Sequence, residues 1–204
     1  MKIQIDKSYP MPCTAEVAWA FLQNLEAVAL CMPGARITER LDAARYKGTV
    51  TLRVGPATMS FRGEVELKDV DPAARSLRLL GKGTDSTGTS GASMSLAARV
   101  EADAGGRCAL VGTSEMSMSG KAASFGGRMM NTVADQILQQ FADNFAARVG
   151  ALEVHRSAAA AGAEAPAALA VPVPAAGTTD LNVIALAWAI LRSWLRRLFC
   201  AKAA

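Results

Sequence analysis

The stretch SFGGRMMNTVADQILQQFADNFAARV occupies residues 124–149 and has the pattern of a long α-helix. Its apolar residues recur at spacings of three and four, which places them along one side of the helix. They are Met130, Val133, Ala134, Ile137, Leu138, Phe141 and Phe145. Because this apolar stripe must be covered, the rest of the domain is expected to supply a partner surface for it.

The chain before this helix alternates between apolar and polar residues, as β-strands do. Pro10 and Pro12 are expected to end a first strand over 2–9, and two short helices follow it, over 14–22 and 25–30. Six more strands with short turns are predicted over 35–41, 45–54, 57–70, 75–83, 89–102 and 107–119. This order predicts an α+β fold, in which a curved antiparallel seven-stranded sheet wraps around the long C-terminal helix.

Beyond this domain, residues 1–150, the composition changes. Residues 151–180 are rich in alanine and proline, and Pro166, Pro172 and Pro174 favour a flexible linker over a continuous helix. Residues 181–204 carry an apolar helical face that includes Trp188 and Trp194, opposite Arg192, Arg196 and Arg197. This pattern is typical of an amphipathic helix that lies in the interface of a bilayer.

Two alternatives for this tail stay open. It could span the bilayer as a tail anchor with its arginines reaching the head groups, or it could pack on the domain or in a partner's groove. The length of the linker favours the membrane. We therefore place the protein at the cytoplasmic face of the inner membrane, either peripheral or tail-anchored.

The net charge of +4 arises from this tail. Arg192, Arg196, Arg197 and Lys202 account for all of it, and residues 181–204 contain no acid. The body is therefore close to neutral, which argues against a nucleic-acid partner. The four cysteines are widely spaced and form no C-x-x-C pair, as expected for reduced thiols.

The sequence offers little support for catalysis. Its single histidine, His155, lies in the linker, so the domain lacks a histidine base, and we find no metal-binding or nucleotide-binding spacing. Asp85, Glu115 and Asp135 could act as bases, but surface positions explain them better. We therefore predict that the protein is not an enzyme.

Methionines instead point to a binding function. On alternating strand positions they share a face with other apolar residues, and more of them open the long helix. Flexible thioethers suit an apolar cavity for a planar or elongated ligand, although ordinary core filling is the alternative. Phe125, in a glycine-flanked loop, could act as a lid or simply start the helix. The predicted ligand-binding residues are Met59, Phe61, Met94, Met116, Met118, Phe125, Met129 and Val133.

Several short motifs resemble the family of the carbon monoxide dehydrogenase G subunit, within the START-like helix-grip superfamily. They are Cys31-Met32-Pro33-Gly34-Ala35, Tyr46-Lys47-Gly48, Val54-Gly55-Pro56, Phe61-Arg62-Gly63, and Gly120 to Gly126 with the sequence GKAASFG. Together they span nearly all of residues 1–150. The resemblance implies a non-catalytic accessory protein that recruits a molybdenum-containing carbon monoxide dehydrogenase, or a related molybdenum hydroxylase, to the membrane.

From the apolar cavity and the tail we add a hypothesis: the protein holds a quinone, without a covalent cofactor, and presents it to the dehydrogenase for electron transfer to the respiratory chain. The expected partners are thus the molybdenum hydroxylase, membrane lipid and a hydrophobic small molecule. Two alternatives remain open at this point. One is a helix-grip cyclase or hydrolase acting on a hydrophobic substrate, and the other is a plain protein tether without a ligand.

Overall fold

Seven antiparallel strands form one sheet in the order β1-β7-β6-β5-β4-β3-β2 in the computed structural model, which describes residues 1–54 and 57–163. The strands are β1 (Lys2–Met11), β2 (Ala35–Arg40), β3 (Arg45–Val54), β4 (Ala57–Asp71), β5 (Ser76–Asp85), β6 (Ser90–Ala102) and β7 (Cys108–Gly120). The helices are α1 (Ala15–Leu22), α2 (Leu25–Ala29), the 3₁₀ helix η1 (Lys121–Phe125) and α3 (Gly127–Ala163).

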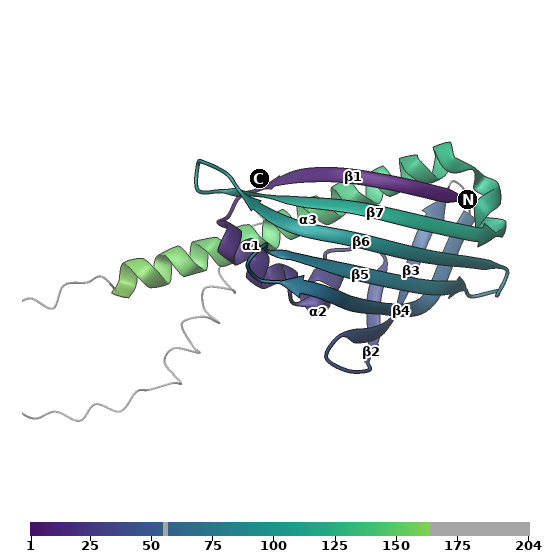
Figure 1. The fold of residues 1–204 in the computed structure, drawn as a ribbon, viewed down its shortest axis with the longest axis horizontal. Helices are drawn as coiled ribbons and strands as arrows, with labels where there is room; N and C mark the ends of the chain where they lie inside the picture. Colours follow the sequence, from purple (N-terminus) through teal and green to yellow (C-terminus); the bar gives the residue numbers. More distant parts are fainter. Residues whose placement is uncertain (55–56, 164–204) are drawn as a thin grey trace, which may run out of the picture. The chain divides into compact units, whose positions relative to one another are not determined.

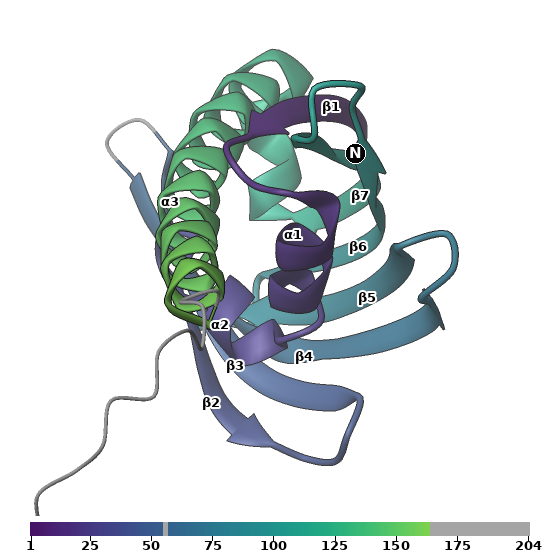
Figure 2. The same cartoon turned by 90° about the vertical axis from the view of Figure 1, so that its left-hand side faces the viewer.

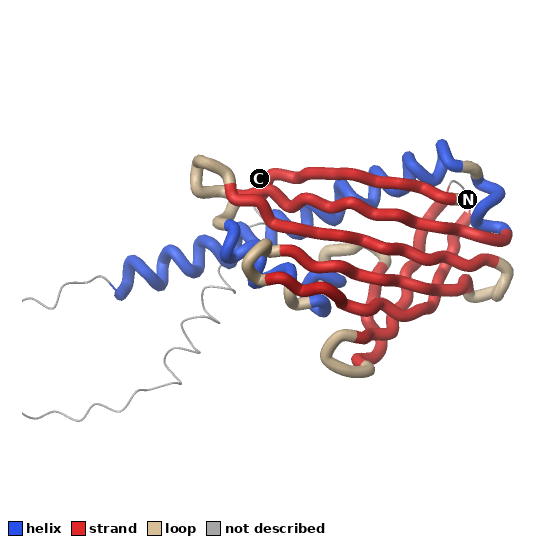
Figure 3. Tube along the Cα trace, in the orientation of Figure 1, coloured by secondary structure: helices blue, strands red, loops and turns tan. Residues whose placement is uncertain are grey.

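The predicted architecture is confirmed. The sheet curls around α3, and α1 and α2 lie on the same side of it (Figure 2). We call this side the inner face and the opposite side the outer face. Figure 3 shows the strands running side by side while α3 crosses behind them. The strands that α3 approaches are mainly β1 and β3, the two flanks of the curve.

Strand β1 is longer than predicted. It continues through Pro10, which pairs with Ala109, and ends at Met11. The expectation that Pro10 ends the strand is therefore wrong. Because β1 is an edge strand with β7 as its neighbour, the missing N–H of proline can face away from the sheet without breaking the ladder.

Helix α3 is also longer than predicted. It begins at Gly127 instead of Ser124, because η1 occupies the preceding residues, and it continues to Ala163. The first part of the predicted linker, 151–163, is therefore helical, and α3 runs past the end of the sheet (Figure 1). Alanine, the strongest helix former, is frequent in this part of the chain and explains the extension.

The remaining linker, 164–180, and the predicted anchor, 181–204 with Trp188, Trp194 and its arginines, lie outside the described residues. Among the helices of residues 1–54 and 57–163, none combines the length and the hydrophobicity that a membrane span requires.

Close contact between β4 and β5 accompanies the curvature of the sheet. Gly63 pairs with Gly83 on the inner face, and Gly48 continues the same row on β3. A Cβ atom at position 63 would overlap the carbonyl oxygen of Lys82 and lie only 2.6 Å from the Cα of Gly83. Only glycine permits this approach of two backbones.

This contact predicts that Gly63→Ala is strongly destabilising. The methyl group would meet backbone atoms that cannot rotate away, so we expect a loss of about 3 kcal/mol or more in the free energy of unfolding, measured by urea titration. Gly81→Ala on β5 is the matched control, since its Cβ would meet the flexible Met94 side chain, with Cε at 3.5 Å, and would lie at an ordinary contact distance of 4.0 Å from the Glu64 carbonyl oxygen. Equal effects of the two substitutions would contradict this explanation of the curvature.

The C-terminal half of α3 is fixed to the start of α1 by Glu153. Its Oε2 accepts hydrogen bonds from the backbone N–H and the hydroxyl of Thr14, both at 3.0 Å, and Arg156 donates to Oε1 at 2.8 Å. The Thr14 backbone hydrogen bond is the main cause that holds the pKa of Glu153 below its ordinary value, and Arg156 adds to it.

Because the pKa of Glu153 is lower in the folded state, its contribution to the stability of the domain depends on pH. Its ionised form contributes stability above the pKa of the unfolded chain, and this contribution is lost as the pH falls through the lower folded-state pKa. We expect Glu153→Gln to cost stability at neutral pH and progressively less between about pH 5 and pH 3. Urea unfolding of both proteins at each pH measures this, and a constant difference across the range would contradict it.

Candidate apolar binding site

The apolar side chains of the inner face form two separate clusters. The larger one lies at the α1 end, where Phe145 of α3 is fully buried and packs edge-to-face on Phe21 with ring centroids 5.0 Å apart. The second lies at the η1 end, and we call it the methionine cluster. Its buried members are Ile3, Phe61, Met118, Ala122 and Met130, and partly buried Met1, Ile5, Met59, Ala92, Met116, Phe125 and Val133 pack against them.

The structure brings most of the predicted ligand-binding residues together in this cluster. They come from β4, β7, η1 and α3, which are far apart along the chain. The members are Met59, Phe61, Met116, Met118, Phe125 and Val133. Phe125 packs against the cluster from η1 instead of standing in an open loop.

The other two predicted residues lie outside the cluster. Met94 of β6 pairs with Met116 on the same face but is only half-buried, and its Cε lies over Gly81 of β5. Met129 is 40% exposed on α3, next to the buried Met130. Successive helix residues point about 100° apart, so the two neighbouring methionines cannot both face the sheet.

The middle of the inner face is apolar but incompletely covered. Val65, Met94 and Leu96 share the inner face with buried residues of their strands, yet all three remain half-buried. This agrees with the position of α3, which approaches the flanking strands β1 and β3 more than the centre of the sheet. These side chains are therefore accessible to a bound apolar molecule.

A hollow of about 490 Å³ lies elsewhere, on the outer face. Three consecutive residues from each of β4, β5, β6 and β7 line it, and none comes from α3 or η1. Of the predicted ligand-binding residues it includes Met118 alone. Its outward-facing residues are mostly small or charged: Arg62, Glu64, Lys82, Thr84, Gly91, Ser93, Ser117 and Ser119.

The acids considered as bases have structural partners. Asp85 accepts hydrogen bonds from the Thr87 hydroxyl at 2.5 Å and the Ser90 N–H at 2.8 Å. Both hydrogen bonds lower the pKa of Asp85, and the one from Thr87 is the main cause. Asp135 forms an ion pair with Lys7 at 2.9 Å. Glu115 accepts from Gln4 on the outer face. These contacts fit surface and turn positions, and the lowered pKa of Asp85 makes this residue a poor general base at neutral pH.

The buried thiols are also poorly suited to chemistry. The Sγ atoms of Cys13 and Cys108 lie 4.0 Å apart, and burial raises the pKa of Cys13 to about 12. The thiolate, which is the reactive form, is therefore scarce at neutral pH. Among the described residues no group of histidine, cysteine and acidic side chains could hold a metal ion.

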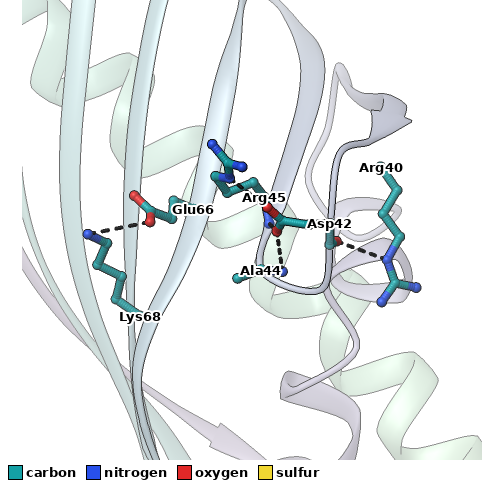
Figure 4. Close-up of polar contacts among 6 residues, drawn as sticks. All are labelled: Arg40, Asp42, Ala44, Arg45, Glu66 and Lys68. Carbon is teal, nitrogen blue, oxygen red and sulfur yellow. Dashed lines mark hydrogen bonds and ion pairs between the residues drawn. The ribbon is translucent and has the colours of Figure 1, made fainter.

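Charged side chains also gather at the β2–β3 turn, where their function is structural (Figure 4). Asp42 accepts hydrogen bonds from the N–H groups of Ala44 and Arg45 at 2.8 Å, and it pairs with the Arg45 guanidinium at 2.7 Å. The backbone hydrogen bond from Ala44 is the main cause that lowers the pKa of Asp42. Closure of a turn by an aspartate side chain fixes a hairpin and needs no ligand.

Comparison with known proteins assigns the chain to a family. The family model of the carbon monoxide dehydrogenase G subunit (CoxG) matches residues 10–150, which is more than half of the chain. The chain belongs to the CoxG family. The resemblance drawn from its motifs is thereby confirmed. Comparison with curated proteins finds no match.

Solved structures support the fold of this CoxG family member. A conserved protein from Geobacillus kaustophilus superposes with a TM-score of 0.65 at 19% identity, covering 72% of this chain and 95% of its own. The Zhui aromatase/cyclase from Streptomyces sp. R1128 has a TM-score of 0.55 at 16% identity, and the match covers 79% of this chain and 99% of the cyclase. A START superfamily protein from Mycobacterium smegmatis has a TM-score of 0.51 at 15% identity, and the match covers 73% of this chain and 98% of the Mycobacterium protein. At these identities the likeness establishes the START-like fold alone.

Sequence reasoning missed two buried serines. Ser90 closes the η1 end of the site: its hydroxyl accepts a hydrogen bond from the N–H of Ala122 at 3.0 Å. Ser114 of β7 faces inward between apolar residues. The alternation of β7, with Gly112, Ser114, Met116 and Met118 on one face, contained the signal for the second serine, but only the structure shows that it is buried.

The contact of Ser90 predicts that Ser90→Ala destabilises the domain. The substitution leaves the buried N–H of Ala122 without an acceptor, so we expect a loss of about 1–2 kcal/mol in the free energy of unfolding, measured by urea titration. Ser93→Ala, on the outer face of the same strand, is the matched control and should change stability by less than about 0.5 kcal/mol. Comparable losses in the two variants would show that the Ala122 contact does not anchor η1.

Proposed function

We propose that this CoxG family member is a non-catalytic accessory protein that binds a hydrophobic small molecule between α3 and the inner face of its sheet. The observation that carries the proposal is the family match over residues 10–150. The methionine cluster supports it, because flexible thioethers and accessible apolar side chains suit a site that must accept a large apolar ligand.

We further propose that the protein recruits a molybdenum-containing carbon monoxide dehydrogenase, or a related molybdenum hydroxylase, to the membrane. The name of the family supports this partner. The sequence of residues 181–204 supports the membrane, since two tryptophans opposite three arginines are typical of an interfacial helix. The tether would raise the local concentration of both the enzyme and a lipid-soluble ligand.

A quinone is the ligand that would connect these functions. The dehydrogenase would deliver two electrons, and the quinone would take them up with two protons and return to the bilayer as the quinol. The apolar inner face would hold the ring and the start of the isoprenoid tail. The resemblance to an aromatase/cyclase concerns the fold and brings no catalytic assembly with it, so the binding function is preferred.

The proposal is tested with the full chain and a variant lacking residues 181–204. Both are incubated with anionic phosphatidylglycerol vesicles that contain menaquinone, and protein and quinone are measured after sedimentation and gel filtration. We expect the full chain to sediment with the vesicles and the truncated chain to remain in the supernatant. Equal distribution of the two proteins would contradict the anchor.

Binding of the ligand is tested in the full chain, without vesicles, using a soluble short-chain naphthoquinone. We expect uptake by this protein and at least about fivefold weaker binding by Met116→Gln, which places an amide in the methionine cluster. Ser117→Gln, on the outer face of the same strand, is the matched control and should bind normally. Absence of binding by the parent protein would favour the plain tether.

A further inference from the structure

Ser114 carries a buried hydroxyl group without a hydrogen-bond partner. The residue is 8% exposed, and its Oγ is the one such side-chain nitrogen or oxygen atom found within the described part of the chain. The other buried serine, Ser90, has its hydroxyl engaged by Ala122. Because buried polar groups in native proteins are nearly always paired, an orphan such as Ser114 calls for a partner from outside the chain.

The residues that pair with Ser114 across the sheet are apolar. It lies opposite Ile5 on β1 and Leu96 on β6, and Met116 is the next inward residue along β7. Ile5 and Met116 belong to the methionine cluster. The hydroxyl is therefore a neutral polar group at the edge of the proposed apolar site.

Glycines beside these residues leave room that flexible side chains now occupy. Leu96 Cδ1 lies 3.6 Å from the position of a Cβ on Gly112, and Met94 Cε lies 3.5 Å from that of Gly81. Leu96 and Met94 of β6 thus lie above glycines of the two strands beside it, Leu96 above β7 and Met94 above β5. Rotation of Met94 and Leu96 would clear space on the inner face without moving the backbone, and both side chains are half-buried.

The charges nearby do not favour a charged ligand. Lys7, the inward residue that follows Ile5 along β1, pairs with Asp135 of α3 at 2.9 Å. The ammonium and the carboxylate compensate each other, so this pair adds no net charge that would favour an ionic ligand. A neutral oxygen is the partner that matches the Ser114 hydroxyl in these surroundings.

We propose that the Ser114 hydroxyl is the polar anchor of the apolar site, and that the ligand is an uncharged apolar compound with a carbonyl or hydroxyl oxygen. This inference rests on the proposed binding function and names the residue that would hold the oxygen of the ligand. A hydrocarbon chain alone would leave the hydroxyl unpaired. A ligand oxygen at this position would fix the orientation of the molecule between the sheet and α3.

Two probes of matched shape test the proposal in the full chain: 2-acetylnaphthalene and 2-isopropylnaphthalene, which has no oxygen. Binding is measured by titration calorimetry with the parent protein, Ser114→Ala and Ser114→Thr. We expect Ser114→Ala to bind the ketone about 5- to 12-fold more weakly and the hydrocarbon within about twofold of the parent. Ser114→Thr, which keeps the hydroxyl, should retain the preference for the ketone.

The carbonyl stretch of the bound ketone gives a second readout. We expect it at lower frequency in the parent protein than in Ser114→Ala, because a hydrogen bond weakens the C=O bond. Thr113→Ala, the outward neighbour on β7, is the matched control and should leave affinity and frequency unchanged. If Ser114→Ala fails to fold, Ser114→Cys, a weak donor of similar size, replaces it.

The outcomes separate this inference from the proposed function. Equal weakening of both probes by Ser114→Ala, or an unchanged carbonyl frequency, would overturn the anchor while leaving the apolar site in place. Failure of both probes to bind the parent protein would overturn the binding site itself. Selective loss of the ketone together with the frequency shift supports the anchor.

Discussion

The close approach of β4 and β5 at Gly63 and Gly83 is the constraint on which the rest of the structure depends. There the two backbones are nearer than any side chain would allow, and the sheet curls enough to surround a helix. A flatter sheet would contact α3 along its centre and bury the inner face completely. With the curl, α3 approaches mainly the flanks, and the central strands keep accessible apolar side chains.

The two apolar clusters divide the inner face into a deeply buried end and an end where more side chains are only partly buried. At the α1 end, rigid aromatic rings and fully buried residues such as Phe145 and Val149 fix α3 to the sheet and to α1. At the η1 end, methionines and half-buried residues replace them. The deeply buried core at the α1 end can therefore supply much of the stability of the domain, while several side chains at the η1 end stay partly exposed.

Membership of the CoxG family gives this division a functional interpretation. An accessory protein does not need activated acids or thiols. Asp85 closes a turn, Asp135 forms an ion pair, and the three cysteines of the described residues are buried. What such a protein needs is a surface that selects a ligand. The inner face offers apolar contact over a wide area and one unsatisfied hydroxyl, which is the composition expected of a site for an oxygen-bearing apolar molecule.

The sequence by itself determined the family, the order of the elements, the long amphipathic helix and the shared face of the strand methionines, because periodicities of two and of three to four residues are local properties. The tertiary structure decided what local patterns cannot contain. Met129 and Met130 have the same chemistry, and only the orientation of α3 exposes one and buries the other. Pro10 stays in β1 because pairing with a distant strand places β1 at the sheet edge. The Ser114 hydroxyl lacks a partner because of its neighbours on β1 and β6, so its burial is a property of the assembled sheet alone.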